Sequence, residues 1–492
     1  MPETVTCLIR TLAPVHLGSG EVYEPLGFVI DEQKPCLVAF EPGDFLNLLP
    51  ETDRRRFLEI CRKGTVDSLL EIYRFYHQHR QRARGREVAV CPGIVQHYRE
   101  VLNVRGDDRK LRTTINQFTI HRTAFLSHDQ RPYIPGTAIK GALRTAYLNA
   151  RAQIKQLPTP KDNRGRWDPR ALENQLLDYR RIDEDPFRLL KVSDFLPVGE
   201  VRTRIIYAIN EKKRVSQFAA RGPYQILEVI EPGAEFVGTI SLEEIPPNLR
   251  SFYKIRHFLQ LDDIWKAARN FYAQEKEKED QVLFEISVPA VSLPAGNGAV
   301  ALRLGRHSGA ECVTIAGHRK IKILQAQGQP PKTMDHATTL WLVADFHQRD
   351  KRHQAHLRPF GWVSFSELTP DQASLLKERE RSWQEESESS RRAATVGVPS
   401  SYIEAGHQAG PPARPVTIAR QETWEGAVLT YEKGRQELIA SWQGKRARAK
   451  GLELVPPELR ESLSGKKAKG AKAKVVVEVE GNAYRIISIQ LL

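Results

Sequence analysis

Residues 134–151 constrain the fold more than any other stretch, because IPGTAIKGALRTAYLNAR joins a Pro-Gly turn directly to a helical pattern. Thr137 belongs to a residue type that caps helices, so we expect the helix to begin there. The apolar positions recur at intervals of three and four and form one stripe: Ile139, Ala142, Leu143, Ala146 and Ala150. The basic positions fall together on an adjacent face: Lys140, Arg144 and Arg151. The stretch therefore predicts an amphipathic helix with a basic face.

The start of this helix has two interpretations that the local pattern leaves open. A helix N-terminus presents unpaired N–H groups and a partial positive charge, so it suits a phosphate where glycines allow close approach. The spacing of Gly136 and Gly141 imitates the first half of a nucleotide-binding loop, but Ala142 and Leu143 stand where lysine and serine or threonine are needed. Nucleotide hydrolysis is therefore not predicted. The other interpretation is an ordinary Pro-Gly turn before an amphipathic helix.

The charge balance favours a polyanionic partner. The 492 residues include 74 Lys and Arg against 60 Asp and Glu, a net charge of +14. Such a surplus attracts phosphates from a distance, which makes nucleic acid the first candidate and an anionic membrane surface the second. A chain of this length normally divides into two to four compact units.

Cysteine usage and hydropathy indicate a cytoplasmic protein without a metal ribbon. The five cysteines are scattered and form no CxxC motif, which predicts reduced thiols, most of them buried: Cys7, Cys36, Cys61, Cys91 and Cys312. The N-terminal residues lack a basic segment leading into a long apolar stretch, and no later run has the length of a membrane span.

Short alternating runs and helical runs follow one another along the first 368 residues, which predicts an α+β domain. Residues 51–120 are predicted to be a helical insertion. Residues 200–230 have alternating arms around the charged tip NEKKR, which predicts a long β-hairpin. Residues 369–420 are rich in charge, Ser, Gly and Pro, and we expect a flexible linker there.

Residues 421–492 predict a small β module, with a hairpin turn at Glu480, Gly481 and Asn482. Between Gln443 and Lys474 the chain holds ten basic and three acidic residues. This tract is either a solvated charge run or, with Trp424, Tyr431 and Trp442 beside it, a second surface for single-stranded nucleic acid. The sequence does not separate the two interpretations.

Four separated motifs occur in an order that resembles the RAMP superfamily of CRISPR effector proteins: PVHLGSGEVYEP, YIPGTAIKGALRTA, LRLGRHSG and RPFGWV. Within that superfamily they are similar to the Csm-type subunits that cap the 3′ end of the guide RNA in type III-A complexes. The resemblance covers roughly Thr4 to Leu368. It implies a ferredoxin-like (RRM-like) core with long insertions and a thumb hairpin that folds over the guide. It also implies three partners: CRISPR RNA (crRNA), with target RNA nearby, a repeated backbone RAMP subunit and a small helical subunit.

The same resemblance implies RNA contacts at three places, read without regard to base sequence. The glycine loops would contribute Gly18, Gly20, Gly305, Ser308 and Gly309. The helix start would contribute Gly136, Thr137, Lys140, Gly141 and Arg144. The hairpin would contribute Arg202, Arg204, Lys212, Lys213, Arg214 and Arg221, and its aromatic residues would either stack on bases or pack inward: Tyr207, Phe218 and Tyr224.

The resemblance implies a subunit without catalytic activity or cofactor, but some superfamily members cut RNA. A metal-independent endoribonuclease is therefore the alternative, with His16 before the GSG loop as its general base. Asp31 and Asp129 are loop acids outside any cutting motif. The run from His347 through Asp350 and His353 to His356 has a metal-like spacing, but its basic neighbours would repel a cation, so no metal site is predicted.

Overall fold

The computed structural model describes residues 3–396, except for 107, 218–219, 221, 246–247, 249–253, 295–298, 324–328 and 349–355. It also describes residues 421–490, except for 433–436, 444, 451–453, 457–458, 461–470 and 481–482. The chain divides into two compact units, Met1–Val398 and Pro399–Leu492. Within the described ranges, no helix is both long and apolar enough to cross a membrane.

The first sheet of the larger unit has ferredoxin-like topology. Six elements follow one another as β-α-β-β-α-β: β1 (Glu3–Thr11), α6 (Gly136–Lys155), β7 (Leu190–Val192), β11 (Glu235–Leu242), α9 (Leu261–Glu285) and β17 (Trp362–Glu367). The strands lie in the order β17-β1-β11-β7 and every neighbouring pair is antiparallel. Two further strands extend the sheet: β12 (Val300–Arg303) beside β17 and β8 (Leu196–Pro197) beside β11. The expected α+β class with a ferredoxin-like core is confirmed.

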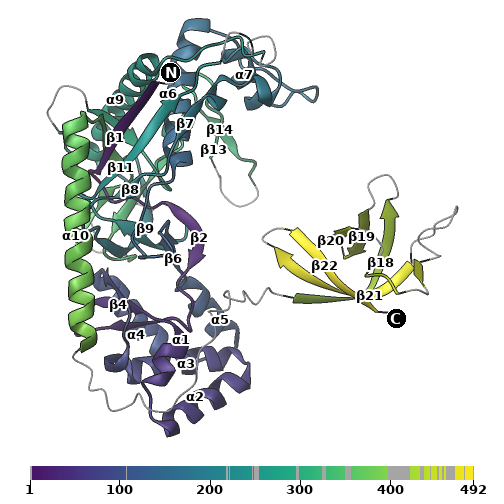
Figure 1. Ribbon diagram of the computed structural model, residues 1–492. Helices are drawn as coiled ribbons and strands as arrows, with labels where there is room; N and C mark the ends of the chain where they lie inside the picture. Colours follow the sequence, from purple (N-terminus) through teal and green to yellow (C-terminus); the bar gives the residue numbers. More distant parts are fainter. Residues whose placement is uncertain are drawn as a thin grey trace. The chain divides into compact units, whose positions relative to one another are not determined.

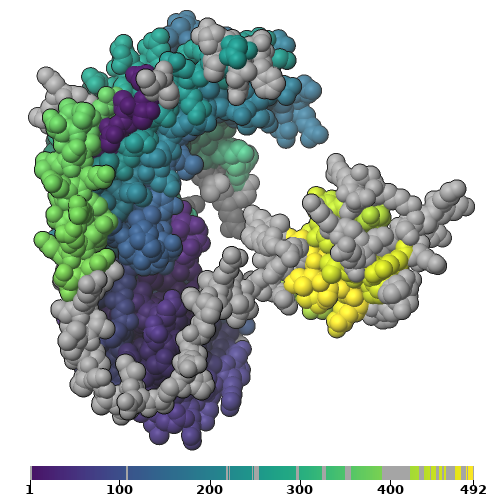
Figure 2. Space-filling view, in the orientation of Figure 1, coloured from purple at the N-terminus to yellow at the C-terminus, as the bar shows by residue number. Residues whose placement is uncertain are grey.

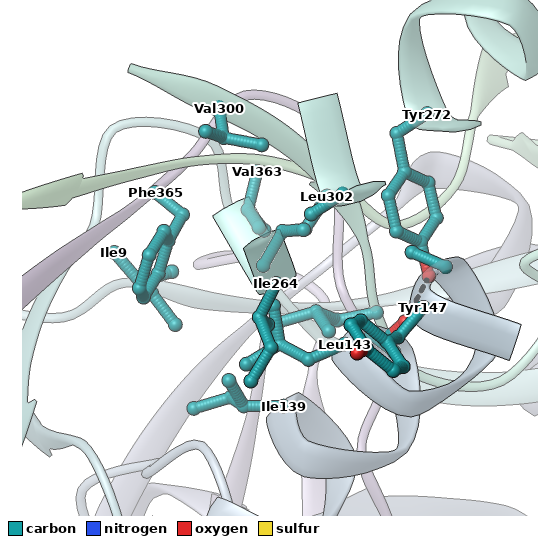
Figure 3. Packing of buried hydrophobic residues seen from close by; sticks show 14 of the residues in the cluster. Ile9, Ile139, Leu143, Tyr147, Ile264, Tyr272, Val300, Leu302, Val363 and Phe365 are labelled. Carbon is teal, nitrogen blue, oxygen red and sulfur yellow. Dashed lines mark hydrogen bonds between the residues drawn. The ribbon is translucent and has the colours of Figure 1, made fainter. Parts of the chain in front are cut away.

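The apolar stripe of α6 packs with α9 against this sheet (Figure 3). Ile139 and Leu143 are fully buried beside Ile264 of α9. The Tyr272 hydroxyl of α9 donates to the Ala142 carbonyl oxygen at 3.2 Å, which joins the two helices. Because this stripe is apolar at intervals of three and four, its burial is what fixes the orientation of α6.

A second sheet in the same unit carries most of the remaining strands. Its order is β2 (Gly18–Val22), β6 (Ile120–Thr123), β10 (Gln225–Ile230), β9 (Thr203–Lys212), β5 (Arg86–Val90), β4 (Cys36–Ala39) and β3 (Phe28–Asp31). Two more strands join it, with β15 (Thr339–Ala344) paired to both β9 and β16 (Arg358–Pro359). Helices α3 (Val66–Gln78), α4 (Pro92–Asn103) and α5 (Asp108–Gln117) contribute to its core, while α1 (Pro42–Asn47) and α2 (Glu51–Lys63) pack with β3 and β4. Helix α7 (Pro169–Leu176) and the pair β13 (Ile321–Ile323) and β14 (Lys332–Met334) complete the unit.

Three local expectations differ from the structure. Residues 51–120 are not wholly helical, because β5 lies among the helices and pairs with β4 and β9. The arms of the predicted hairpin do pair, as β9 and β10, but β9 also bonds to β5 and β15. The hairpin arms are thus central strands of a sheet, and the reason lies in the run Ile205–Ile209, which is buried at every position rather than at alternate ones. Thr137 is not the N-cap, since α6 begins at Gly136 after Pro135.

The predicted linker begins with a long helix. Helix α10 (Pro370–Val396) occupies the first part of it, and residues 397–420 lie outside the described ranges. The Thr369 hydroxyl accepts from the Gln372 amide at 3.3 Å while the Gln372 side chain accepts from the Thr369 amide at 2.9 Å, a reciprocal capping box. The residues Thr-Pro-Asp-Gln are a sequence signal for the start of a helix, but the polar composition of the segment predicts a linker. Figure 2 shows α10 as a continuous ridge on the surface of the larger unit.

Helix α10 is held to the larger unit by charged side chains. The two guanidinium nitrogens of Arg131 donate to the two carboxylate oxygens of Glu380 at 2.7 and 3.1 Å, and the Gly199 amide donates to the same carboxylate at 2.7 Å. Arg131 also lies 4.2 Å from the ring centre of Trp383, and Arg379 pairs with Glu235. A polar helix is thus ordered by ion pairs instead of an apolar stripe.

The smaller unit is a closed five-stranded barrel (Figure 1). Its strands are β18 (Gln421–Glu432), β19 (Glu437–Trp442), β20 (Lys445–Lys450), β21 (Ala471–Glu480) and β22 (Ala483–Gln490). Around the barrel they lie in the order β18-β19-β20-β22-β21, and β20 pairs with β22 in parallel. Trp424, Leu429 and Val475 are fully buried in its own core.

Candidate nucleic-acid interface

Three of the four sequence motifs meet through their backbones. The Arg306 amide donates to the His16 carbonyl oxygen at 2.8 Å, which joins LGRHSG to PVHLGSG. The Leu304 amide donates to the Gly361 carbonyl oxygen at 2.8 Å, and the Gly361 amide donates to the Pro14 carbonyl oxygen at 2.9 Å. These bonds close a ring of three segments that are far apart in the sequence. We call this ring the glycine junction: residues 14–20, 304–309 and 358–361.

Two glycines at the junction are needed for close backbone approach. Gly305 has φ +82°, and a Cβ there would lie 2.4 Å from the His16 carbonyl oxygen. Gly361 has φ +83°, and a Cβ there would lie 2.6 Å from the Leu304 carbonyl oxygen. Both positions therefore favour glycine for two reasons: the positive φ strains other residues, and a Cβ would clash with a carbonyl oxygen. Ser308 is buried and donates to the Gly305 carbonyl oxygen at 2.6 Å, so it holds the loop in shape.

The outer surface of the junction is polar and carries a free cation. Gly18, Ser19 and Gly20 are exposed at the start of β2. Arg306 is exposed beside them and has no ionic partner among the described residues. Its charge helps to lower the pKa of both His16 and His121, which places all three groups in one neighbourhood. Sequence reasoning missed Arg306, although it lies inside the LGRHSG motif between two predicted site residues.

His16 lies beneath this surface instead of on it. Its side chain is 1% exposed, and its Nδ1 lies 2.7 Å from the Glu228 carbonyl oxygen. Burial, more than any other cause, lowers the pKa of His16 to about 4, so the ring is neutral near pH 7. A general base must reach the proton that it removes. The buried position therefore counts against the alternative catalytic role of His16.

The helix start of α6 is engaged by the protein itself. The Gly136 amide donates to the Asp194 carboxylate at 2.8 Å, so an internal anion already occupies the positive end of the helix. A Cβ at Gly136 would lie 2.4 Å from the Val192 carbonyl oxygen. The glycine therefore allows the backbone of Val192 to lie close to the start of α6. Thr137 and Gly141 are exposed on the same turn and the next one.

The two cations of the helix start also have partners inside the protein. Lys140 Nζ donates to the Leu190 carbonyl oxygen at 2.7 Å. Arg144 lies 2.9 Å from a carboxylate oxygen of Glu173 and 2.9 Å from one of Asp185. These pairs raise the pKa of the guanidinium although burial opposes them. The predicted RNA contacts of Lys140 and Arg144 stay a prediction, and in this structure both side chains join α6 to neighbouring segments.

The tip of the predicted hairpin and the LGRHSG loop line one cavity of about 940 Å³. The residues that they contribute include Lys212, Lys213, Arg214, His307 and Gly309. The structure thus brings together four residues predicted from two separate motifs. Several cations of the wall are neutralised, as Lys213 lies 2.6 Å from Glu311 and Arg303 lies 2.6 Å from Glu279.

The other basic residues of the hairpin differ in exposure and in ionic partners. Arg202 lies 3.3 Å from Glu200 and is largely exposed, whereas Arg204 lies 3.6 Å from Asp345 and is mostly buried. Arg214 is exposed, and no ionic partner is found for it in the part of the chain that is described. Arg221 and Phe218 lie outside the described residues.

The two described aromatic residues of the hairpin, Tyr207 and Tyr224, lie in a cluster of packed rings. Tyr207 is fully buried, and its hydroxyl lies 3.0 Å from His97 Nδ1. Tyr224 and His347 complete this cluster, with ring centres 4.5 Å apart. Tyr207 is therefore not available to stack on a base.

The histidines of residues 347–356 do not form a metal site in the described part of the chain. His347 belongs to the aromatic cluster, His356 lies near Asp345, and no group of metal ligands is found among the described residues. Asp350 and His353 lie outside the described residues.

Comparisons with known proteins identify a family. The family model described as the RAMP superfamily matches residues 8–282. A chain in the cryo-EM structure of a Csm–crRNA–target RNA ternary complex of a type III-A CRISPR-Cas system is 19% identical, with a TM-score of 0.48; the match covers 74% of this chain and 100% of that one. The crystal structure of T. onnurineus Csm5 is 18% identical, with a TM-score of 0.39; the match covers 61% of this chain and 89% of that one. No curated protein matches.

Proposed function

This chain belongs to the RAMP superfamily, and from that premise we propose that it is an RNA-binding subunit of a type III CRISPR effector ribonucleoprotein. The observation that carries the proposal is the family match over residues 8–282, more than half of the chain. The net charge of +14 supports a polyanionic ligand. In this proposal the chain binds the 3′ part of crRNA, caps the filament of backbone subunits and also contacts the small helical subunit.

We assign the main phosphate contacts to the glycine junction. Its turn Gly18–Gly20 is exposed, and Arg306 supplies an exposed cation for which the described residues hold no ionic partner. Arg214 and Lys212 extend this basic surface along the cavity at the hairpin tip. Backbone amides and arginine side chains hold phosphates without reading bases. This fits a subunit that must accept guides of any sequence.

The proposed role is non-catalytic, and the burial of His16 supports it. Superfamily members that cut RNA with a histidine need that ring at the substrate, whereas His16 is 1% exposed. Endoribonuclease activity is the competing function. It would appear as metal-independent cleavage that is lost in His16→Ala.

Site-specific crosslinking within the assembled effector tests the position on the guide. Photoreactive uridines are placed either in the 5′ part or in the 3′ part of the crRNA, and crosslinks to this chain are identified by mass spectrometry. Crosslinks from the 3′ part to residues of the glycine junction are expected. Crosslinks from the 5′ part alone would overturn the assignment.

A salt titration of RNA affinity tests the phosphate contact. Arg306→Ala should weaken binding several-fold and reduce the slope of log affinity against log salt by about 0.7, the value for one phosphate contact on a single strand. The control is Arg55→Ala, which removes the same charge from the exposed face of α2, where Arg55 pairs with Glu51 at 3.0 Å. Equal losses of RNA affinity in both variants would mean that Arg306 acts only through the net charge of the protein.

A further inference from the structure

The barrel of the smaller unit has a specific topology. Its first three strands, β18, β19 and β20, form an antiparallel meander, the third strand pairs in parallel with the fifth, and the first pairs with the fourth. This is the strand order of an OB-fold, a five-stranded Greek-key barrel. The first strand of the barrel bends at a bulge between Trp424 and Ala427, where Gly426 has φ +75°. The unit lies outside the residues that match the RAMP family.

The barrel has a core of its own. Trp424, Leu429, Leu438, Val475 and Val477 are 0% exposed, and every member of this cluster belongs to residues 424–489. The first strand also pairs with both the second and the fourth, which leaves no open edge. A closed sheet around a self-contained core is expected to fold without the rest of the chain.

One outer face of the barrel carries exposed arginines beside apolar side chains. Residues on β18, β19 and β20 alternate between the core and the outside, and the outward set includes Val428, Thr430, Glu437, Ile439, Ser441, Arg446 and Arg448. We call this set the β18–β20 face. Register places Ser441 between Val428 and Arg446, and Ile439 between Thr430 and Arg448. Lys472 of β21 continues the first row beyond Val428.

The cations of this face differ from the other cations of the barrel. Lys445 lies 2.7 Å from Glu422 and Lys474 lies 3.2 Å from Glu425, so both are neutralised at short range. Arg448 lies 3.7 Å from Glu437 and is 60% exposed. Arg446 is exposed without an ionic partner in the described part of the barrel. Among these cations, Arg446 and Arg448 of the β18–β20 face are therefore the ones most open to a ligand.

The spacing of these arginines suits an extended polyanion. Arg446 and Arg448 are two residues apart on one strand, a rise of about 7 Å, which is comparable to the distance between neighbouring phosphates on an extended strand. Guanidinium groups bind phosphate in a bidentate manner. Val428, 38% exposed, and half-buried Ile439 provide apolar contacts for base faces next to these cations. Cations beside apolar side chains suit a negatively charged ligand whose bases are exposed, as they are in a single strand.

The aromatic residues of the barrel limit the mode of binding. Trp424 is buried, and Trp442 stacks on it with ring centres 5.9 Å apart while donating to the Glu425 carbonyl oxygen at 2.9 Å. The Trp424 ring is therefore not presented to a base, whereas Trp442 is only partly buried. We assign the main contacts of the barrel to its charged side chains.

We propose that the C-terminal barrel is a second binding module, which holds the sugar-phosphate backbone of single-stranded nucleic acid across the β18–β20 face through Arg446 and Arg448. The module binds independently of the RAMP unit and without base preference. RNA and DNA strands share the chemistry that it recognises.

The test uses purified residues 399–492, whose fold is checked by the near-UV circular dichroism of the stacked pair Trp424 and Trp442. Fluorescence anisotropy is measured with labelled single-stranded RNA, single-stranded DNA and duplex DNA over a salt series. Both single strands should bind, with a slope of log affinity against log salt near −1.4 for two phosphate contacts. Arg446→Ala/Arg448→Ala should weaken binding about tenfold or more and flatten that slope.

The matched control is Lys445→Ala/Lys474→Ala, which removes the same formal charge from cations that already have carboxylate partners. It should stay within about threefold of the wild type. A preference for RNA would add a 2′-hydroxyl contact, and equal affinity for both strands would show backbone recognition; either result supports the module. Three results would overturn it: no binding at low salt, equal losses in the two variants, or duplex bound as tightly as single strands.

Discussion

The His16 carbonyl oxygen accepts a hydrogen bond from the Arg306 amide at 2.8 Å, and this one bond joins two motifs that are almost 300 residues apart. It places the backbone of LGRHSG against the start of the first motif. Arg306 is left on the outside and the His16 ring on the inside. The contact thus separates the residue that we assign to RNA from the residue that is structural.

Gly305→Ala should destabilise the glycine junction. A Cβ would lie 2.4 Å from the His16 carbonyl oxygen at a φ of +82°, and we expect a loss of about 2–4 kcal/mol in the free energy of unfolding from strain and clash together. Gly317→Ala is the control, because Gly317 has φ +79° with nothing within 4 Å of a Cβ. Urea denaturation measures both. Equal losses in the two variants would show that the close approach to His16 costs nothing.

Arg144→Ala should reduce stability and leave RNA affinity unchanged. Removal of the guanidinium leaves Glu173 and Asp185 without their shared partner, at a cost of about 1–3 kcal/mol. Arg170→Ala is the comparison, since it removes one positive charge from an exposed site on the neighbouring helix α7. Thermal unfolding and RNA titration are both measured. Weaker RNA binding at unchanged stability would restore Arg144 to the phosphate site.

The larger unit should lose stability as pH falls from 7.5 to 5. Burial lowers the pKa of His16 and of His97 to about 4, below the ordinary value of 6.5. Between these values the unfolded chain binds protons that the folded chain does not, so stability is complete above pH 6.5 and declines toward pH 4. The decline at pH 5 is about 2 kcal/mol per histidine.

His16→Gln provides the control for this pH dependence. Gln keeps a donor for the Glu228 carbonyl oxygen but does not titrate. The difference in unfolding free energy between pH 7.5 and pH 5, taken from urea curves, should therefore be smaller in the variant whatever its absolute stability. An unchanged difference would mean that His16 does not carry a lowered pKa.

Glu380→Gln should loosen helix α10. The carboxylate accepts from both guanidinium nitrogens of Arg131 and from the Gly199 amide, and an amide can satisfy only part of this set. Faster proteolysis and faster amide exchange within α10 are expected. Glu385→Gln affects only an exposed pair with Arg381 at 3.2 Å and should behave like the wild type. If α10 in Glu380→Gln is as well protected from proteolysis and amide exchange as in the wild type, other contacts hold the helix.

Local pattern determined much of the fold. The stripe of α6 is buried as expected because helical periodicity places Ile139 and Leu143 on one face whatever the rest of the chain does. The capping box at Thr369 is an equally local signal for the start of α10, whereas the polar composition of residues 369–420 predicts a linker. The run Ile205–Ile209 is a different case: residues 200–230 predict alternating hairpin arms, but this run is apolar and buried at every position.

The candidate site depended on partners that no local window contains. The sequence by itself determined the α+β class, the presence of an amphipathic helix within residues 134–151 and the family motifs, because each follows from spacing within a few residues. Only the tertiary structure decided that Lys140 and Arg144 bond to Leu190, Glu173 and Asp185. It also leaves Arg306 exposed, with no ionic partner in the ranges that the structure describes. A charged side chain is available to a ligand only where no carboxylate or carbonyl of the fold reaches it first, and chain folding alone brings those groups within hydrogen-bonding distance.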